Sequence, residues 1–344
     1  MRPIEVTALT AGEFDPSRRF RVCQFVDGLR TRGIDVTELH PFFSKYAAAP
    51  IAQLGFIWTA GKILARVPGV AAARGADITW LQRELIPGRF TLERYAGRRI
   101  LLDIDDAVWM DRRGEKAIEQ VAKHSAGVIA GNNFLGDFFR RRGIRVWIVP
   151  TSVDTSRWKP LPANDRATWT IGWMGTASNL QYLGSIEEPI AEFLRRHNDA
   201  ELLVVSDRAP AFNQIPEHRW RFERWSPARE VEQVQQMNVG LMPLAATDWE
   251  RGKCGLKMLT YMAAGAPTIA TPVGISEEIM ARSTVGVLAR TDRDWYEALE
   301  TLYQDRALAI QLGQAGRQLV EAEYSVKHNV DKLANIFHQV ANEL

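Results

Sequence analysis

Residues 150–174 read PTSVDTSRWKPLPANDRATWTIGWM, and this stretch divides the chain into two similar halves. Its first part, 150–168, is rich in Pro, Ser, Asp and Asn and has no long hydrophobic periodicity, which predicts a linker. Its last part, 170–174, is an apolar run that predicts the first strand of a new domain. A chain of 344 residues is long enough for two domains, so we expect a domain boundary in this stretch.

Short β-branched runs alternate with helical patterns on both sides of the linker. Before it, the runs lie at 4–9, 35–39, 77–81, 99–103, 127–130 and 146–149. After it, they lie at 170–174, 201–205, 220–223, 239–242, 267–270 and 285–288, and helical patterns follow at 292–304, 306–321 and 325–342. The alternation predicts an α/β fold with two parallel sheets, each covered by helices on both faces. Ligands of such sheets bind beyond the carboxyl ends of the strands, so two such edges facing each other across a cleft would hold a two-part substrate.

The composition is that of an ordinary globular protein, with 46% hydrophobic and 24% charged residues. The formal net charge of +2 gives no reason to expect nucleic-acid binding. Cys23 and Cys254, the two cysteines, lie in different halves, so neither a disulfide framework nor a zinc site is expected. Without a signal-peptide pattern or an apolar run of about 18 residues, the chain is expected to be cytoplasmic.

The range 51–73 is strongly apolar but also carries Lys62, Arg66, Phe56 and Trp58. One interpretation is a helix that packs on the core and exposes one face to solvent. The other is a helix on a membrane interface, where aromatic and basic residues would meet lipid headgroups. The protein would then be peripheral at the inner face of the membrane.

A dense group of Gly, Lys and Arg follows the predicted strand at 239–242. Gly252 and Gly255 allow backbone to approach a ligand closely, and the helix that we expect to start here presents free N–H groups. Lys253 and Lys257 would lie one helical turn apart and point the same way. This pattern predicts an anion site, although a surface helix with solvated lysines would look similar.

A second glycine turn, after the strand at 170–174, contains Gly175, Thr176 and Ser178. A strand, a Gly turn and a helix rich in capping residues suit a phosphate. The absence of a GxGxxG pattern removes the main support for a NAD site.

Charged residues also follow two strands of the first half. Asp103 ends the strand at 99–103, and Asp105 and Asp106 follow it; these carboxylates could bind a metal, orient an acceptor hydroxyl or act as a base. A solvated loop with a helix cap is the alternative. After the first strand, Ser17 is followed by three arginines, Arg18, Arg19 and Arg21. They cannot all face the core, so we expect at least one of them to meet an anion or acceptor across the cleft.

Five motifs, in this order along the chain, together resemble GT4-type glycosyltransferases of the retaining GT-B superfamily. They are LLDIDDAVW at 101–109, VIAGNNFLGDFF at 128–139, VPTSVDTSRWKP at 149–160, IGWMGTASNLQYL at 171–183, and the block from GLMPL to PVG at 240–274. Many family members carry two glutamates seven residues apart in the last block. Here Glu250 is followed by Lys257, and Thr260 takes the usual second position.

The resemblance implies two Rossmann-like domains in the GT-B arrangement: 1–150 for the acceptor, a linker at 151–168, and 169–324 for a nucleotide-sugar donor. It implies a last helix at 325–344 that crosses back to the first domain, and transfer with retention, without a metal or other cofactor. The implied partners are the donor and a glycan, lipid-linked or small-molecule acceptor. The implied catalytic residues are Asp103, Asp105, Asp106 and Lys257. The implied donor-binding residues are Gly175, Thr176, Ser178, Glu250, Arg251, Lys253, Gly255, Lys257 and Thr260.

Four other interpretations remain at this stage. Asp103 and Asp105 have the Asp-x-Asp spacing of a GT-A metal site, but a GT-A enzyme would have a single mixed-sheet domain. A nucleotide-sugar epimerase would share the two-domain architecture. A binding-only relative would tolerate the incomplete glutamate pair, and a two-lobed sugar-binding protein would normally be exported.

Overall fold

The computed structural model describes residues 2–13, 15–42, 45–47, 55–111, 114–161 and 168–343. The contacts within the chain define two compact units. Unit 1 comprises Met1–Ser152, Gly252–Cys254 and Val326–Leu344, and unit 2 comprises Val153–Arg251 and Gly255–Ser325. No helix in the described ranges is long and apolar enough to cross a membrane.

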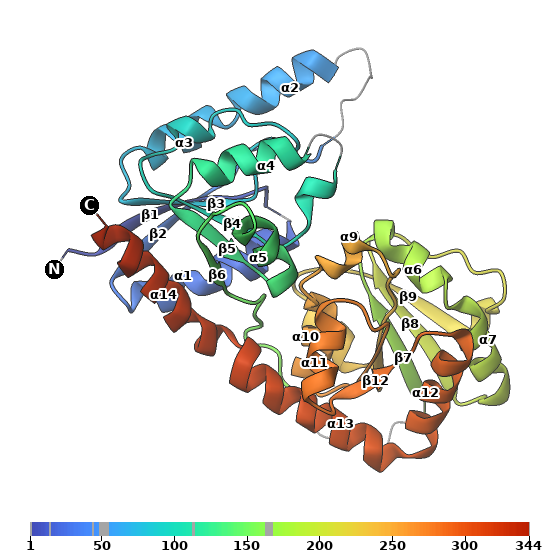
Figure 1. The fold of residues 1–344 in the computed structure, drawn as a ribbon. Helices are drawn as coiled ribbons and strands as arrows, with labels where there is room; N and C mark the ends of the chain where they lie inside the picture. The colour runs from blue at the N-terminus through green and yellow to red at the C-terminus, as the bar shows by residue number, and fades with distance from the viewer. Residues whose placement is uncertain are drawn as a thin grey trace. The chain divides into compact units, whose positions relative to one another are not determined.

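Unit 1 is built on a six-stranded parallel sheet with the order β2-β1-β3-β4-β5-β6 (Figure 1). The strands are β1 Ile4–Leu9, β2 Ile34–Leu39, β3 Ile78–Gln82, β4 Ile100–Ile104, β5 Gly127–Ala130 and β6 Val146–Ile148. Every residue of β3, β4 and β5 is buried, which explains why these strands are near-continuous apolar runs in the sequence. Each strand overlaps one of the runs expected from the sequence.

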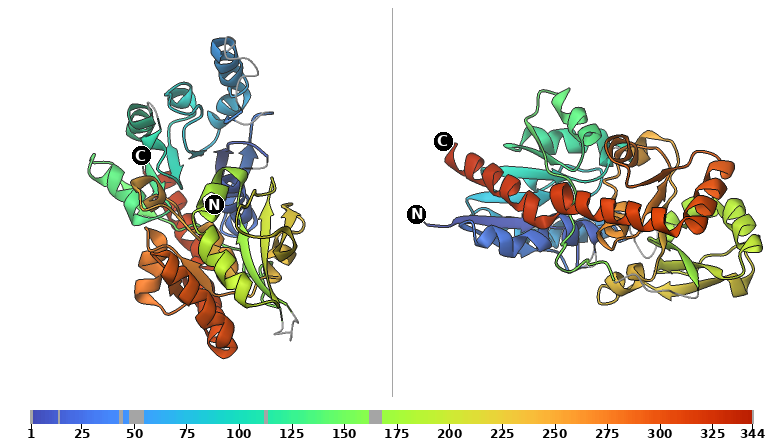
Figure 2. Two further views of the ribbon diagram at one scale, coloured as in Figure 1. Left: turned by 90° about the vertical axis from the view of Figure 1, so that its right-hand side faces the viewer. Right: turned by 90° about the horizontal axis from the view of Figure 1, so that it is seen from below.

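Helices cover both faces of this sheet. They are α1 Val26–Arg30, α2 Gly55–Leu64, α3 Val67–Ala73, α4 Gly114–Lys123, α5 Asn133–Arg140 and α14 Val326–Asn342. The last of these joins the unit 1 core, where Phe337 lies edge-to-face on Trp80 with ring centroids 5.3 Å apart. Figure 2 shows α14 running alongside the N-terminal elements, which confirms that the C-terminal helix returns to the first domain.

Unit 2 repeats the architecture, with the strand order β12-β11-β10-β7-β8-β9, all parallel. Its strands are β7 Trp169–Met174, β8 Ala200–Ser206, β9 Trp220–Arg224, β10 Val239–Met242, β11 Thr268–Ala270 and β12 Gly286–Leu288. Its helices are α6 Leu180–Gly184, α7 Glu187–Arg196, α8 Glu230–Gln235, α9 Asp248–Arg251, α10 Leu256–Ala263, α11 Ile275–Arg282, α12 Asp292–Gln304 and α13 Arg306–Leu319. Two separate six-stranded parallel sheets confirm the predicted fold class and contradict the single mixed sheet of a GT-A enzyme.

Two local expectations were wrong. The range 51–73 does not form one helix, because α2 ends at Leu64 and α3 restarts at Val67 with Pro68 in its first turn; residues 51–54 lie outside the described ranges. The core-packed interpretation fails for α2, which has no buried residue. The chain between Arg251 and Leu256 is not helical either, so Lys253 does not share a helix with Lys257. Of the expected linker, 162–167 lie outside the described ranges.

Candidate active site

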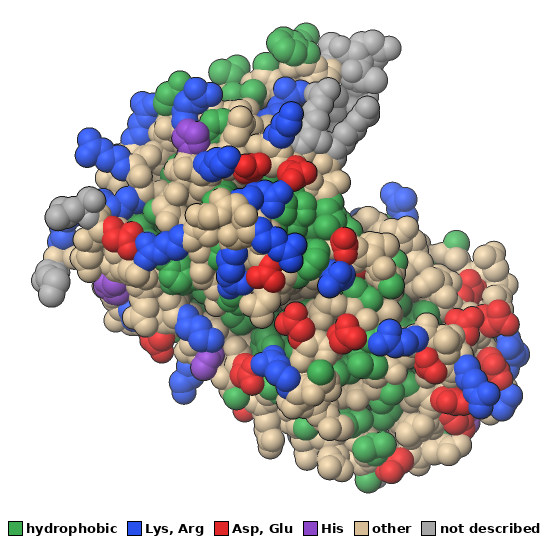
Figure 3. Space-filling view, viewed as in Figure 1, with side chains coloured by type: hydrophobic (Ala, Val, Ile, Leu, Met, Phe, Trp, Pro, Cys, Tyr) green, Lys and Arg blue, Asp and Glu red, His purple; other side chains and the backbone are tan. Residues whose placement is uncertain are grey.

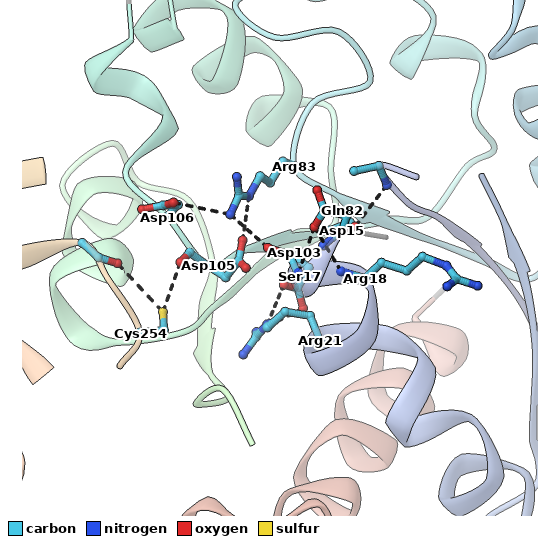
Figure 4. Close-up of polar contacts among 12 residues, drawn as sticks. Asp15, Ser17, Arg18, Arg21, Gln82, Arg83, Asp103, Asp105, Asp106 and Cys254 are labelled. Carbon is cyan, nitrogen blue, oxygen red and sulfur yellow. Dashed lines mark hydrogen bonds and ion pairs between the residues drawn. The ribbon is translucent and has the colours of Figure 1, made fainter. Parts of the chain in front are cut away.

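The carboxyl ends of β1, β3 and β4 bring three charged segments of unit 1 together (Figure 4). Because the strands are parallel neighbours, residues that follow each strand meet at one edge of the sheet. Asp15 caps the first turn after β1 by accepting from the backbone N–H of Ser17, at 2.8 Å. Ion pairs at this edge join residues that lie up to 82 positions apart in the sequence.

Arg21 and Asp103 form a buried, bidentate ion pair. Arg21 Nε lies 2.9 Å from Asp103 Oδ1, and Nη2 lies 3.1 Å from Oδ2. Arg21 Nη1 also donates to the carbonyl of Val149 at 2.6 Å, and Trp80 Nε1 donates to Asp103 at 3.3 Å. Burial raises the pKa of Asp103, while the guanidinium of Arg21 acts in the opposite direction. Both carboxylate oxygens of Asp103 are therefore engaged in holding unit 1 together.

This pairing also bears on the Asp-x-Asp interpretation. Asp103 faces Arg21, whereas Asp105 faces a different cation, so the two carboxylates do not converge on one point. Across the described ranges, no group of three or more His, Cys, Asp or Glu side chains is arranged as a metal site.

Arg83 is the residue of this edge that the sequence analysis missed. Its Nε lies 2.6 Å from Asp105 Oδ1, and its Nη2 lies 3.6 Å from Asp106 Oδ2. Its two terminal nitrogens also donate to Ser17 Oγ at 3.1 Å and to Tyr46 Oη at 2.9 Å. Its φ of 55° places it in the left-handed region, and within the described residues it is the one non-glycine residue with a positive φ.

The two aspartates beside Arg83 titrate in opposite directions. Burial would raise the pKa of Asp105, but the adjacent guanidinium of Arg83 outweighs burial and lowers it. Burial raises the pKa of Asp106, because the attraction of the more distant Arg83 and of Lys253 does not offset it. Asp105 is thus held as an anion, and of these two carboxyls Asp106 is the one that takes up a proton more readily.

The remaining arginines after β1 have different surroundings. Arg18 makes two contacts of 2.9 Å with the carboxylate of Glu38 on β2. Arg19 lies with its guanidinium 5.2 Å from the ring centroid of Phe20. The structure therefore brings Ser17 and Arg21 to the acidic motif and turns Arg18 toward β2.

Residues Gly252–Cys254 belong to unit 1, although they interrupt the sequence of unit 2. Asn132 Nδ2 donates to the carbonyls of Gly252 and Lys253, both at 3.2 Å. Cys254 Sγ donates to the carbonyl of Asp105 at 3.3 Å (Figure 4). Lys253 is thus placed beside the acidic motif, where it acts on Asp106.

In unit 2, the start of α10 lies next to the end of β7. Lys257 Nζ lies 4.6 Å from the ring centroid of Trp173, a cation–π distance. Gly175 is required here, since a Cβ at this position would lie 2.6 Å from the Trp173 ring and 3.2 Å from Lys257 Nζ. Gly255, with a φ of 70°, precedes the helix and provides no side-chain cap.

The other expected donor residues differ in burial and in partners. Glu250 is buried and accepts hydrogen bonds from the hydroxyls of Tyr182 and Thr247. Thr260 is buried and donates to the carbonyl of Lys257 at 2.7 Å, within its own helix. Arg251 is exposed and lies 3.1 Å from Asp248. Two exposed hydroxyls in the turn after β7 lie 3.0 Å apart, those of Thr176 and Ser178.

Residues 169–305 match the family model of glycosyl transferases group 1. This segment resembles a group 1 glycosyltransferase domain. The match spans the sheet of unit 2, Lys257 and the glycine turns, and it confirms the glycosyltransferase class that the motifs implied. A comparison with curated protein sequences found no significant match.

Solved glycosyltransferase structures resemble the whole chain. Sucrose-phosphate synthase from Thermosynechococcus elongatus has 14% identity and a TM-score of 0.70, covering 98% of this chain and 99% of its own. HepE from Anabaena, in complex with UDP and glucose, has 11% identity and a TM-score of 0.73, covering 97% and 99%. A glycosyltransferase from Rickettsia africae has 11% identity and a TM-score of 0.70, covering both chains fully. At these identities the likeness shows the shared fold, and that fold is the GT-B fold.

Proposed function

We propose that the enzyme transfers a sugar from a nucleotide-diphosphate sugar to an acceptor hydroxyl, with retention of configuration and without a metal. Unit 2 would hold the donor and unit 1 the acceptor. Two findings support the donor class: the group 1 domain spans most of unit 2, and the similar HepE structure contains UDP and glucose. The GT4-type resemblance supports retention.

The observation that carries the proposal is the position of Lys257. It is the second residue of α10, at a helix start with unsatisfied N–H groups, and its ammonium lies over Trp173 at the end of β7. When the glycosidic bond of the donor breaks, negative charge develops on the leaving phosphate. A lysine and a helix N-terminus would stabilise that charge, which is the task a metal performs in other transferases.

The neighbouring residues fit supporting roles in this proposal. Gly175 would bring its backbone close to the diphosphate, and Thr176 and Ser178 would offer hydroxyls to it. Glu250, held by Tyr182 and Thr247, would accept from hydroxyls of the nucleotide sugar. On unit 1, Asp105 and Asp106 would face the acceptor, and Asp103 would act through Arg21.

The first experiment measures thermal stabilisation by UDP, GDP, ADP and their glucose derivatives, since a ligand of the native state raises the melting temperature. Transfer is then followed with the stabilising donor, with and without EDTA, and the anomeric configuration is read by NMR. We expect one base to stabilise the protein, EDTA to leave turnover unchanged, and the product to keep the donor configuration. Loss of turnover in EDTA that Mn²⁺ restores would contradict the metal-free mechanism. Epimerisation of the donor without transfer would contradict the function.

We also propose that α2 and its surroundings contact an anionic membrane. Phe56, Ile57 and Leu64 are 86%, 67% and 69% exposed, and hydrophobic side chains over α2 appear on the surface in Figure 3. Arg74 and Arg94 flank the exposed ring of Tyr95, with centroid distances of 5.4 and 5.6 Å. An exposed apolar helix that itself carries Trp58 and Lys62 suits a lipid headgroup layer.

Cosedimentation with phosphatidylglycerol vesicles tests this contact. We expect binding at low salt, release at high salt, and loss of binding when Phe56 and Ile57 are both replaced by Asp. The matched control is Ile310→Asp, because Ile310 is an exposed aliphatic residue on α13 of unit 2. Equal binding by the double variant and the control would refute the contact.

A further inference from the structure

Trp173, near the end of β7, contacts both the hydrophobic core of unit 2 and Lys257. Its side chain belongs to the core cluster and is 0% exposed. Lys257 Nζ lies 4.6 Å from the centroid of its ring, which is within the range of a cation–π interaction. The ring is therefore both a core residue and a contact surface for the cation that the proposed function assigns to the donor diphosphate.

Gly175 shows how closely the ring and the ammonium converge. A Cβ on Gly175 would lie 2.6 Å from the Trp173 ring and 3.2 Å from Lys257 Nζ. The indole therefore lies against the glycine turn that follows its own strand, and the ammonium reaches the same point from α10. These three residues meet at the carboxyl end of β7, which is the end of a parallel strand where ligands bind.

A second contact holds α10 against the end of β7. Tyr261, one helical turn after Lys257, accepts from the backbone N–H of Met174 at 2.8 Å. The two side chains of α10 thus contact adjacent residues of β7, Trp173 and Met174. Because the Tyr261 hydroxyl fixes this face of the helix, the remaining freedom of Lys257 is in its side chain, and the indole ring limits that freedom.

The indole N–H of Trp173 does not explain why a tryptophan is found here. Trp173 Nε1 is buried and has no hydrogen-bond partner within the described residues. A buried donor without an acceptor lowers stability, and a phenylalanine ring would avoid that loss. Tryptophan attracts a cation over its ring more strongly than phenylalanine does. The face of the ring is thus the feature of Trp173 that matches its surroundings.

An aromatic ring can hold an ammonium without neutralising its charge. The flexible four-carbon stem of a lysine loses conformational entropy when a ligand fixes it. A stem that is already held over a ring has lost part of this freedom, so less of it is lost on binding. A carboxylate in the same place would cancel the charge, as Asp103 does for Arg21 in unit 1. The ring therefore suits a lysine that has to bind an anion.

We propose that Trp173 is a positioning residue of the donor site, which holds the Lys257 ammonium at the carboxyl end of β7 for the diphosphate of a nucleotide sugar. This rests on the proposed function, which assigns the diphosphate to Lys257. Trp173 acts through Lys257 and does not bind the diphosphate itself, because its side chain is fully buried. Its effect on nucleotide binding therefore depends on the presence of Lys257.

A double-mutant cycle separates this role from packing in the core. Calorimetric titration with UDP, GDP and ADP in EDTA identifies the nucleotide that the wild type binds most tightly. Trp173→Leu should raise its dissociation constant about tenfold, and Trp173→Phe should stay within about threefold of the wild type because it keeps an aromatic face. In a Lys257→Ala background, where ligand-observed NMR extends the measurement to weak binding, Trp173→Leu should have no further effect.

Trp169 provides the matched control, because it lies at the start of the same strand and also has a cation over its ring. It is 3% exposed, belongs to the same core cluster, and the guanidinium of Arg306 lies 5.0 Å from its ring centroid. Trp169→Leu should lower the melting temperature, as Trp173→Leu does, and leave the nucleotide affinity unchanged.

Fluorinated tryptophan tests the ring without changing the core. Fluorine withdraws electrons from the face of the indole and weakens its attraction for a cation. A wild-type protein that carries 5-fluorotryptophan at every tryptophan should bind the nucleotide about twofold more weakly than the unlabelled protein. The same labelling of Trp173→Phe should leave its affinity unchanged. This comparison decides the proposal even if Trp173→Leu does not fold.

Three results would overturn the proposal. They are an equal loss of nucleotide affinity from Trp173→Leu with and without Lys257, an equal loss from Trp169→Leu and Trp173→Leu, and unchanged affinity of the fluorinated wild type. Normal sugar transfer alongside any of them would leave the proposed function intact. A protein that shows the expected dependence on Lys257 but transfers no sugar would refute the proposed function and support the role of Trp173. A wild type that binds none of the three nucleotides would refute both.

Discussion

The carboxyl edges of the two sheets handle charge in different ways. In unit 1 the charges are buried in pairs: Arg21 with Asp103, and Arg83 with Asp105 and Asp106. In unit 2 the corresponding edge has a lysine over an aromatic ring, a helix start and glycine-lined backbone. Paired charges give a nearly neutral, rigid surface that suits a hydroxyl-rich acceptor, whereas a cation at a helix N-terminus suits a diphosphate. Under the proposed function, two sheets of the same architecture would thus provide two different binding chemistries.

The largest effect should come from breaking the buried pair of unit 1. Arg21→Met and Asp103→Asn should each lower the free energy of unfolding by about 3–5 kcal/mol, because either change leaves the other partner buried without its counter-charge. Urea denaturation followed by tryptophan fluorescence measures this loss. The control is Arg2→Met, since Arg2 pairs with Asp77 at the surface and should contribute under about 1 kcal/mol. Equal stability of Arg21→Met and Arg2→Met would show that the buried pair contributes no more to stability than a surface pair.

The second effect is the pH dependence that a buried lysine gives to unit 1. Burial lowers the pKa of Lys45 from 10.5 to about 8, so between these pH values the unfolded chain binds a proton that the folded chain does not. Stability relative to Lys45→Met should therefore rise with pH across this window, by roughly 3 kcal/mol at most. Denaturation curves at several pH values from 7.5 to about 10.5 measure the difference. Parallel curves for the two proteins would show that Lys45 titrates normally.

The third effect concerns catalysis and belongs to unit 2. Lys257→Ala should lower kcat/KM by roughly a hundredfold, comparable to the loss of one oxyanion donor, while the fold survives. The control is Arg293→Ala, because Arg293 on α12 is exposed and paired with Glu297. Steady-state kinetics with the donor found by thermal stabilisation measures both. Near-wild-type kinetics for Lys257→Ala would place the diphosphate elsewhere.

The smallest expected effect concerns a buried tyrosine hydroxyl of unit 2. Tyr261 is fully buried, and its hydroxyl accepts from the backbone N–H of Met174 at 2.8 Å, where β7 ends. Tyr261→Phe should cost about 1 kcal/mol of stability, because it leaves that N–H without an acceptor. It should also raise the donor KM, since Met174 precedes Gly175. Unchanged stability would show that a water molecule replaces the hydroxyl.

Local pattern alone was sufficient to predict the strands. All twelve strands of the described chain overlap runs expected from the sequence, because buried parallel strands are short continuous apolar segments. Gly175 and Gly255 were also identifiable, since close backbone approach and a positive φ demand glycine. The sequence pattern could not predict which cation each of the three aspartates pairs with, because Asp103, Asp105 and Asp106 occur within four residues of one motif.

Pairing between distant charges was decided by the tertiary structure. Arg83 has no local motif, and its partner Asp105 lies 22 residues away, just beyond the end of the neighbouring strand β4. Lys253 was expected beside Lys257, but the non-helical segment after α9 places it with unit 1. Hydrophobic periodicity is a property of neighbours along the chain, so the sequence by itself determined the two α/β sheets. Ion pairs depend on which strands lie side by side, so only the folded chain decided which charges are neutralised and which atoms remain for a ligand.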